Sequence, residues 1–297
     1  VSFSSFPDET ALLSDWVLPD HTGLESFGYQ RVLAGSDRPA LSALQPVVAP
    51  LYNTRATADV LIAAARTRGG ALSAAMVYQD EVDFIQQKIL PYINAGGFYT
   101  APEILTFWSS WLQYGGWWKA AAEPVSLDFN PALGAPLPVA APPALEGGKY
   151  HIVAFATQMG DGSGANRPWL QETPDPTTTV MWNSWIEIHP DTAAKLGLHD
   201  DDVVRVSSAA GELEASVYLF PAIRPDTVAM PFGQGHSALG RFAEGRGANP
   251  AALFELTVNE AGDLALGDLQ VTLTPTGKRR PLARLESREG VYGDHAG

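Results

Sequence analysis

A glycine-rich segment at residues 231–250, PFGQGHSALGRFAEGRGANP, holds the densest set of residues that could contact a ligand. Glycine lets the backbone approach a bound group, and backbone N–H groups, histidine and asparagine can donate hydrogen bonds to a phosphate or a heterocycle. Gly233, Gly235, His236 and Asn249 are therefore the first candidate ligand-binding residues. The alternative is an irregular surface loop. The residues alone leave both interpretations open, although long loops within a domain are often functional.

A second segment of this kind is MGDGSGANRPWLQETPDP at residues 159–176. It lacks the lysine of a phosphate-binding Walker loop and the spacing of a dinucleotide fingerprint. Asp161 and Arg167 are its candidate ligand-binding residues. A plain connection between two strands is the alternative, and the residues slightly favour it.

No residue pattern indicates catalysis or a metal site. The six histidines are scattered without ligand spacing, no GxSxG elbow occurs, and the chain has no cysteine. Thiolate zinc sites, a cysteine nucleophile and cysteine-held iron–sulfur clusters are thereby excluded from these residues. The acidic run at 199–202 is expected to be a solvated turn, because neighbouring residues of a strand point to opposite faces. We predict no catalytic residue and no metal ligand.

Composition narrows the class of protein. The 297 residues include 19 Lys and Arg against 33 Asp and Glu, a formal net charge of −14. This balance argues against nucleic-acid binding, which needs a basic surface. No apolar run is long enough to span a membrane. The length suggests about two domains. The chain starts at Val1 within a dense apolar pattern, so we expect a fragment or a processed product.

A proline-rich stretch at 124–143 divides the chain into two differently patterned parts and predicts a linker. Before it, helices are expected at 56–70 and 76–93, and short strands at 15–20 and 46–53. Four of the eight tryptophans lie at 107–118 and indicate core or interface packing. After the linker, six β-rich runs separated by turn residues indicate a barrel or sandwich: 149–157, 184–190, 201–208, 211–220, 226–233 and 269–277. A short helix is expected between an N-cap at Asp191 and Gly197.

Residues 185–250 resemble the C-terminal dinucleotide-binding domain of the molybdopterin oxidoreductase family. The matching features are WIEIHPDTAAKLGL, the acidic turn before VVRV, Gly211, and IRPDTVAMPFGQGH followed by GANP. Upstream, TALLSDWVLPDHTGLESFGY at 10–29 resembles the segment that closes the family's α/β domain. One departure is Asp201, where the family usually has glycine. Aspartate tolerates the left-handed backbone better than most residues.

The resemblance implies an α/β remnant of a cofactor-binding domain at 1–123, a linker at 124–147, a mostly β double-psi barrel at 148–285 and a tail at 286–297. The six candidate residues of the two loops would then contact a pterin dinucleotide, if one is bound.

The segment DGSGANRPWLQETPDPTT with WNSWIEIHP resembles the large subunit of quinone-linked complexes, namely alternative complex III and its polysulfide-reductase-like relatives. That resemblance implies a scaffold for an iron–sulfur relay carried elsewhere, with molybdopterin guanine dinucleotide absent. It implies iron–sulfur, cytochrome c and quinol-oxidising membrane subunits as partners, on the periplasmic (exoplasmic) face of a bacterial inner membrane.

Two alternatives remain. The segment could embrace the cofactor of an active molybdenum or tungsten reductase of the polysulfide or thiosulfate type. It could also be a free-standing β-barrel binding module. Residues 144–285 expressed alone would separate this last interpretation from a subunit.

Overall fold

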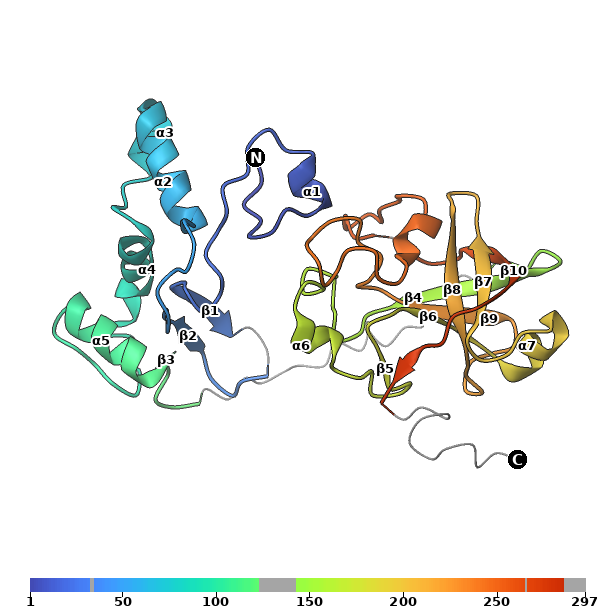
Figure 1. Ribbon diagram of the computed structural model, residues 1–297. Helices are drawn as coiled ribbons and strands as arrows, with labels where there is room; N and C mark the ends of the chain where they lie inside the picture. Colours follow the sequence, from blue (N-terminus) through green and yellow to red (C-terminus); the bar gives the residue numbers. More distant parts are fainter. Residues whose placement is uncertain (33–34, 123–142, 265, 286–297) are drawn as a thin grey trace. The chain divides into compact units, whose positions relative to one another are not determined.

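The computed structural model describes residues 1–32, 35–122, 143–264 and 266–285 (Figure 1). The chain forms two compact units: residues 1–6 and 13–137 make the first, and residues 7–12 and 138–297 make the second. The assignment of residues 7–12 to the second unit is a feature that the sequence did not predict. Most of the expected linker, and all of the expected tail at 286–297, lie outside the described residues.

The first unit combines a small antiparallel sheet with helices. Its strands, in the order β1-β2-β3, are β1 (Gly28–Val32), β2 (Ala40–Leu44) and β3 (Gly116–Trp118). Its helices are α2 (Thr57–Arg68), α3 (Gly70–Ala75), α4 (Glu81–Ile89), the 3-10 turn η1 (Leu90–Tyr92) and α5 (Ile104–Tyr114). The helices expected at 56–70 and 76–93 correspond to α2 and α4.

The strands expected at 15–20 and 46–53 were wrong. Residue 17 forms only an isolated bridge with Ser2, and no strand is assigned within 46–53. Pro19, Pro46 and Pro50 have no N–H to donate to a sheet, which disfavours strand pairing at both places.

The tryptophan-rich run at 107–118 forms the core of the first unit. Phe107, Trp111 and Trp117 are buried and pack with Leu41 of β2 and Ile89 of α4. Aromatic side chains bury the largest apolar areas of any residue. Core packing, one of the two roles predicted for this run, is therefore confirmed.

The second unit is built on a closed six-stranded barrel in the order β10-β4-β9-β6-β8-β7. All six β-rich runs of the sequence became its strands, so the predicted barrel is confirmed. The strands are β4 (Lys149–Phe155), β6 (Trp185–Ile188), β7 (Asp202–Ser207), β8 (Glu212–Leu219), β9 (Thr227–Pro231) and β10 (Gln270–Arg279). Ile186 and Ile188 of β6 point into its core with Val204 and Val206 of β7. Burying each such side chain contributes about 1.5–3 kcal/mol.

Short elements surround the barrel: α1 (Glu9–Leu12), α6 (Pro168–Gln171), β5 (Val180–Met181), α7 (Pro190–Leu196), the 3-10 turn η3 (Pro250–Leu253) and β11 (Ala283–Arg284). Helix α7 ends at Gly197 in the left-handed conformation, as predicted. Its N-cap is His189 rather than Asp191, because the His189 Nδ1 accepts the Asp191 N–H and Pro190 takes the first helical position.

The acidic turn at 199–202 is not solvated as expected. Asp200 Oδ1 accepts the Leu219 N–H at 2.9 Å, and Asp201 Oδ1 accepts the Leu282 N–H at 3.0 Å. The Asp200 and Asp201 side chains are only 15% and 17% exposed, and both lie near Arg284. Asp201 has φ +71°, so aspartate adopts the left-handed backbone at this position. Its carboxylate also joins the turn to β11. Across the described residues, the helices are all too short or too polar to cross a bilayer.

Candidate functional site

Two parallel strands bring the candidate loops together. Strands β4 and β9 pair in parallel, with Phe155 opposite Pro231 at their ends, and the Phe232 N–H donates to the Phe155 carbonyl at 2.8 Å. The carboxyl ends of parallel neighbours lie at the same edge of a sheet. The loops that follow, 157–167 and 232–250, therefore leave the barrel side by side.

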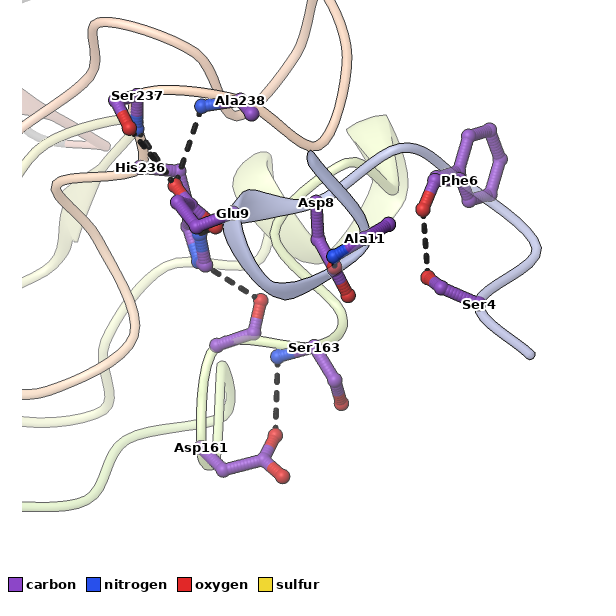
Figure 2. A network of polar contacts seen from close by, with 11 residues as sticks. Ser4, Phe6, Asp8, Glu9, Ala11, Asp161, Ser163, His236, Ser237 and Ala238 are labelled. Carbon is purple, nitrogen blue, oxygen red and sulfur yellow. Dashed lines mark hydrogen bonds and ion pairs between the residues drawn. The ribbon is translucent and has the colours of Figure 1, made fainter. Parts of the chain in front are cut away.

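His236 joins the two loops and a third, distant segment (Figure 2). Its Nε2 lies 3.1 Å from the Gly162 carbonyl oxygen, and its Nδ1 lies 3.2 Å from Glu9 Oε2. Both partners can only accept hydrogen bonds. A ring N–H of His236 is therefore the donor in a hydrogen bond to either partner.

Glu9 occupies a small anion-binding nest in the glycine-rich loop. Its Oε1 accepts the backbone N–H groups of Ser237 at 2.7 Å and Ala238 at 3.1 Å, beside the contact with His236. Burial raises the pKa of Glu9, but hydrogen bonds from its own backbone N–H, His236, Ala238 and Ser237 outweigh it and lower the pKa to about 2. Backbone N–H groups that converge on one carboxylate, beside an imidazole ring, are the typical chemistry of an oxyanion site.

The segment that carries Glu9 is also bonded to the glycine-rich loop at Pro7 and is held in shape by its own first helical turn. The Leu239 N–H donates to the Pro7 carbonyl oxygen at 2.9 Å. Asp8 Oδ1 accepts the Ala11 N–H at 2.6 Å and so caps the first turn of α1. These contacts explain why residues 7–12 belong to the second unit.

Gly233 and Gly235 allow the loops to pack on their own chain. Their φ angles are +104° and +88°. A Cβ atom on Gly233 would lie 2.5 Å from the Met159 Cβ, and one on Gly235 would overlap the backbone of Ala248 and Asn249. The close approach that glycine permits here is therefore made by protein atoms.

A buried amide pair closes the space behind the glycines. Gln234 Nε2 donates to Gln171 Oε1 at 2.7 Å, while Gln171 Nε2 donates to the Ala165 and Phe242 carbonyl oxygens at 2.8 and 3.2 Å. The hollow lined by these glutamines and Met159 measures only about 10 Å³. That is room for roughly one water molecule.

The other three predicted residues have different placements. Asn249 Oδ1 accepts the Ala251 N–H at 3.0 Å and caps η3. Asp161 Oδ1 accepts the Ser163 N–H at 3.0 Å, a bond that lowers its pKa and shapes an exposed turn. Arg167 precedes α6, and its guanidinium has no partner within the described residues. The structure thus brings Gly233, Gly235 and His236 together, and a pterin-binding role for all six residues stays a prediction.

Sequence reasoning missed Glu9, which lies 227 positions from His236. No local pattern could have found it, since the contact depends on where residues 7–12 pack. It also missed Gln171 and Gln234. Among the residues that the structure describes, no group of three or more histidines and carboxylates is placed to hold a metal ion. The geometry can bind an oxyanion, but it offers no nucleophile or acid–base pair with a substrate position.

Comparison with known proteins identifies the second unit. Residues 169–261 match the family model "Molydopterin dinucleotide binding domain". The menaquinone reductase molybdopterin-binding-like subunit of Nitratidesulfovibrio vulgaris is 30% identical over 267 residues, covering 90% of this chain. The chain belongs to the C-terminal portion of the molybdopterin oxidoreductase family.

Two further comparisons show a shorter sequence match and a shared fold. The arsenate respiratory reductase molybdopterin-containing subunit of Shewanella sp. is 38% identical over 87 residues, which cover 29% of this chain and 10% of that subunit. Acetylene hydratase from Pelobacter acetylenicus shares the fold at a TM-score of 0.64 and 18% identity, over 91% of this chain and 39% of that one. The chain spans about a third, 36%, of the menaquinone reductase subunit.

The family binds a pterin dinucleotide, so the loops must be tested for available donors. The donors are present in the Ser237 and Ala238 amides and His236, yet the Glu9 carboxylate already uses them. With Glu9 in place, the Ser237 and Ala238 amides are not available to a phosphate group of the cofactor.

Proposed function

We propose that this chain is part of the molybdopterin-oxidoreductase-like subunit of a membrane-associated, quinone-linked electron-transfer complex of the alternative complex III type. It acts there as a scaffold for an iron–sulfur relay carried by other parts of the subunit or complex. In support, the relative that matches 90% of the chain bears the name of a menaquinone reductase subunit that is molybdopterin-binding-like. The relatives named as molybdopterin-containing match under a third of the chain.

One observation in particular supports the scaffold role: Glu9 occupies the anion-binding nest of the glycine-rich loop. Glu9 supplies the negative charge that a phosphate of the cofactor would bring, and the buried pair of Gln171 and Gln234 holds the loops shut. A loop that is saturated by its own chain gains stability without a ligand, because its buried donors are already satisfied. This favours a family member that keeps the fold and does not bind the pterin here.

Partners and location follow from the resemblance and are part of the proposal. We infer iron–sulfur, cytochrome c and quinol-oxidising membrane subunits as partners, and the periplasmic face of a bacterial inner membrane as the site of assembly. The net charge of −14 is compatible with partners that present basic surfaces.

Metal and pterin analysis of the intact complex tests the scaffold role. The complex would be purified through a tag on this subunit and assayed for quinol oxidation, molybdenum, tungsten and the fluorescence of oxidised pterin. We expect quinol oxidation with iron present and with molybdenum, tungsten and pterin far below one per complex. Stoichiometric metal with pterin would overturn the proposal.

The match to the dinucleotide-binding family model favours a second candidate, a cofactor-embracing domain of an active molybdenum reductase. Glu9 would then have to leave the nest. This candidate predicts that replacing His236 and Asn249 together by alanine lowers the cofactor content of the complex. A matched control replaces Glu244, an exposed residue of the same loop, by glutamine. Unchanged cofactor content in the double variant would exclude these residues as ligands.

A further inference from the structure

The first unit contains a pocket that the proposed scaffold role leaves unused. It has a volume of about 330 Å³ and is lined by residues 21–27, residues 46–50 and the first turns of α2 and α4. Its lining combines the apolar side chains of Phe27, Val48 and Val82 with four carboxylates. No lysine or arginine is among the lining residues.

Three of these carboxylates serve the backbone. Glu25 accepts the Thr22 and Leu51 N–H groups, each at 3.0 Å. Asp59 accepts the Glu81 N–H at 2.7 Å, and Asp80 caps α4 by accepting the Asp83 N–H at 2.8 Å. Because these three carboxylates already accept backbone hydrogen bonds, they shape the pocket and are not its candidate ligand-binding groups.

Glu81 differs from all of them. Its half-buried carboxyl has no hydrogen-bond donor among the described residues. Burial, followed by the charges of Asp59, Asp20 and Asp80, raises its pKa to about 7. The histidine of the pocket, residue 21, uses its Nδ1 on the Thr54 hydroxyl at 2.7 Å. The apolar-walled pocket therefore presents negative charge that no cation of the first unit neutralises within the described residues.

We propose that this pocket receives a lysine side chain from another polypeptide of the complex, with its ammonium group on Glu81. A lysine pairs a compact charge with a four-carbon stem. The stem would lie along Phe27 and Val48, while the ammonium group meets the one carboxyl that lacks a donor. The cavity, at about 330 Å³, has room for such a chain. The net charge of −14 favours basic partners.

This inference rests on the proposed membership of a multi-subunit complex. The test is zero-length crosslinking of the intact, purified complex with a carbodiimide, which condenses a carboxyl and a nearby amine into an amide with loss of water. Mass spectrometry then maps the linked peptides. We expect an amide between Glu81 and a lysine of another polypeptide.

Matched variants sharpen the test. Glu81→Gln keeps the shape of the side chain and removes the reactive carboxyl, so the link should be lost. It should also weaken retention of the partner at moderate salt by roughly fivefold. Glu103→Gln removes an exposed carboxyl that makes no cap bond at the start of α5, and should leave both results unchanged.

The outcomes separate the two proposals. A tagged chain that purifies without other subunits would contradict the proposed function. An intact complex in which Glu81 forms no link to another polypeptide, while other carboxyls do, would overturn the pocket proposal alone. So would a Glu81→Gln complex that retains its partner as well as the Glu103→Gln complex does.

Discussion

Glu9 in the second unit and Glu81 in the first unit have carboxyls that behave in opposite ways. Glu9 is 41% exposed at its side chain, yet hydrogen bonds from the glycine-rich loop lower its pKa to about 2. Glu81 lies in a pocket without a donor, and burial and three aspartates raise its pKa to about 7. The supply of donors accounts for the difference, since a hydrogen bond to the charged form favours it and desolvation disfavours it.

The contrast extends to the space around each residue. Glu9 already bonds the Ser237 and Ala238 amides of its nest, whereas the pocket beside Glu81 leaves a volume of about 330 Å³. The backbone donors around Glu9 are bonded to a residue of the chain itself. The pocket beside Glu81 has a carboxyl without a donor and enough space for a side chain. The occupied nest thus lies in the part of the chain that matches the dinucleotide-binding family, which we call the closed region. The pocket beside Glu81, the open region, lies in the first unit.

The largest effect is expected where the closed region is broken. Gly235→Ala places a methyl group against the backbone of Ala248 and Asn249 at φ +88°, so overpacking and strain add to about 3–5 kcal/mol lost. Hydrogen exchange of the second unit measures this loss. Gly245→Ala is the control, because Gly245 has φ +71° but nothing within 4 Å of its Cβ position. Its cost should be only about 1–2 kcal/mol. Equal effects would show that the loops are loosely packed.

The closed region also shows what the sequence could and could not predict. Each barrel strand is a short run rich in apolar or β-forming residues between turn residues, so the pattern in 201–220 alone indicates β7 and β8. Strand β1, GYQRV, is mostly exposed and carries no such pattern. Its pairing with β2 depends on contacts that form only when the first unit folds, so no local pattern predicts it.

The candidate site divides in the same way. Composition marked Gly233, Gly235 and His236, because glycine and histidine in a long loop are a local signal. The nest also needs Glu9, whose contact with His236 spans 227 positions. Nothing near Glu9 in the sequence distinguishes it from other surface glutamates. Asn249 and Asp161 were polar loop residues of the expected type that turned out to bond the neighbouring backbone.

The second prediction concerns the open region. Glu81 has an ordinary pKa of 4.5, raised to about 7 in the folded chain. It is protonated in both states below pH 4.5, and the cost of ionising it grows up to pH 7 and is complete above that. In the chain free of partners, Glu81→Gln should therefore stabilise the first unit above pH 7 and leave it unchanged below pH 4.5. After discounting for solvent screening, the gain should be about 1–2 kcal/mol.

Hydrogen exchange of the α4 amides at pH 4 and pH 8 measures this difference, with intrinsic exchange rates corrected for pH. Glu103→Gln serves as the exposed control. A Glu81→Gln variant that is less stable at pH 8 would mean that the carboxylate has a favourable partner within the chain, and the comparison with Glu9 would fail.

The same substitution at Glu9 should have the opposite sign. The pKa of Glu9 falls from 4.5 to about 2 on folding, so its contribution is present above pH 4.5 and is lost as the pH falls toward 2. Because the side chain is 41% exposed, we expect Glu9→Gln to cost only roughly 1 kcal/mol at pH 7. Faster exchange of the Ser237 and Ala238 amides reports it. Glu244→Gln, in the same loop, is the control and should leave the exchange of those amides unchanged. Equal protection of the amides in both variants would contradict their hydrogen bonds to Glu9.

The smallest effect is expected at a third carboxylate, Asp201, which has a backbone donor like Glu9 and whose side chain is only 17% exposed. Asp201→Asn keeps an acceptor for the Leu282 N–H and tolerates φ +71°, so it loses only the charge that faces Arg284 at 3.4 Å and Arg279 at 3.6 Å. We expect roughly 0.5 kcal/mol in denaturant unfolding of the second unit. Asp201→Ala loses the acceptor and strains the backbone, and should cost about three times as much. If Asn and Ala were equally costly, charge rather than donor supply would govern this turn, and the rule drawn from Glu9 and Glu81 would not extend to it.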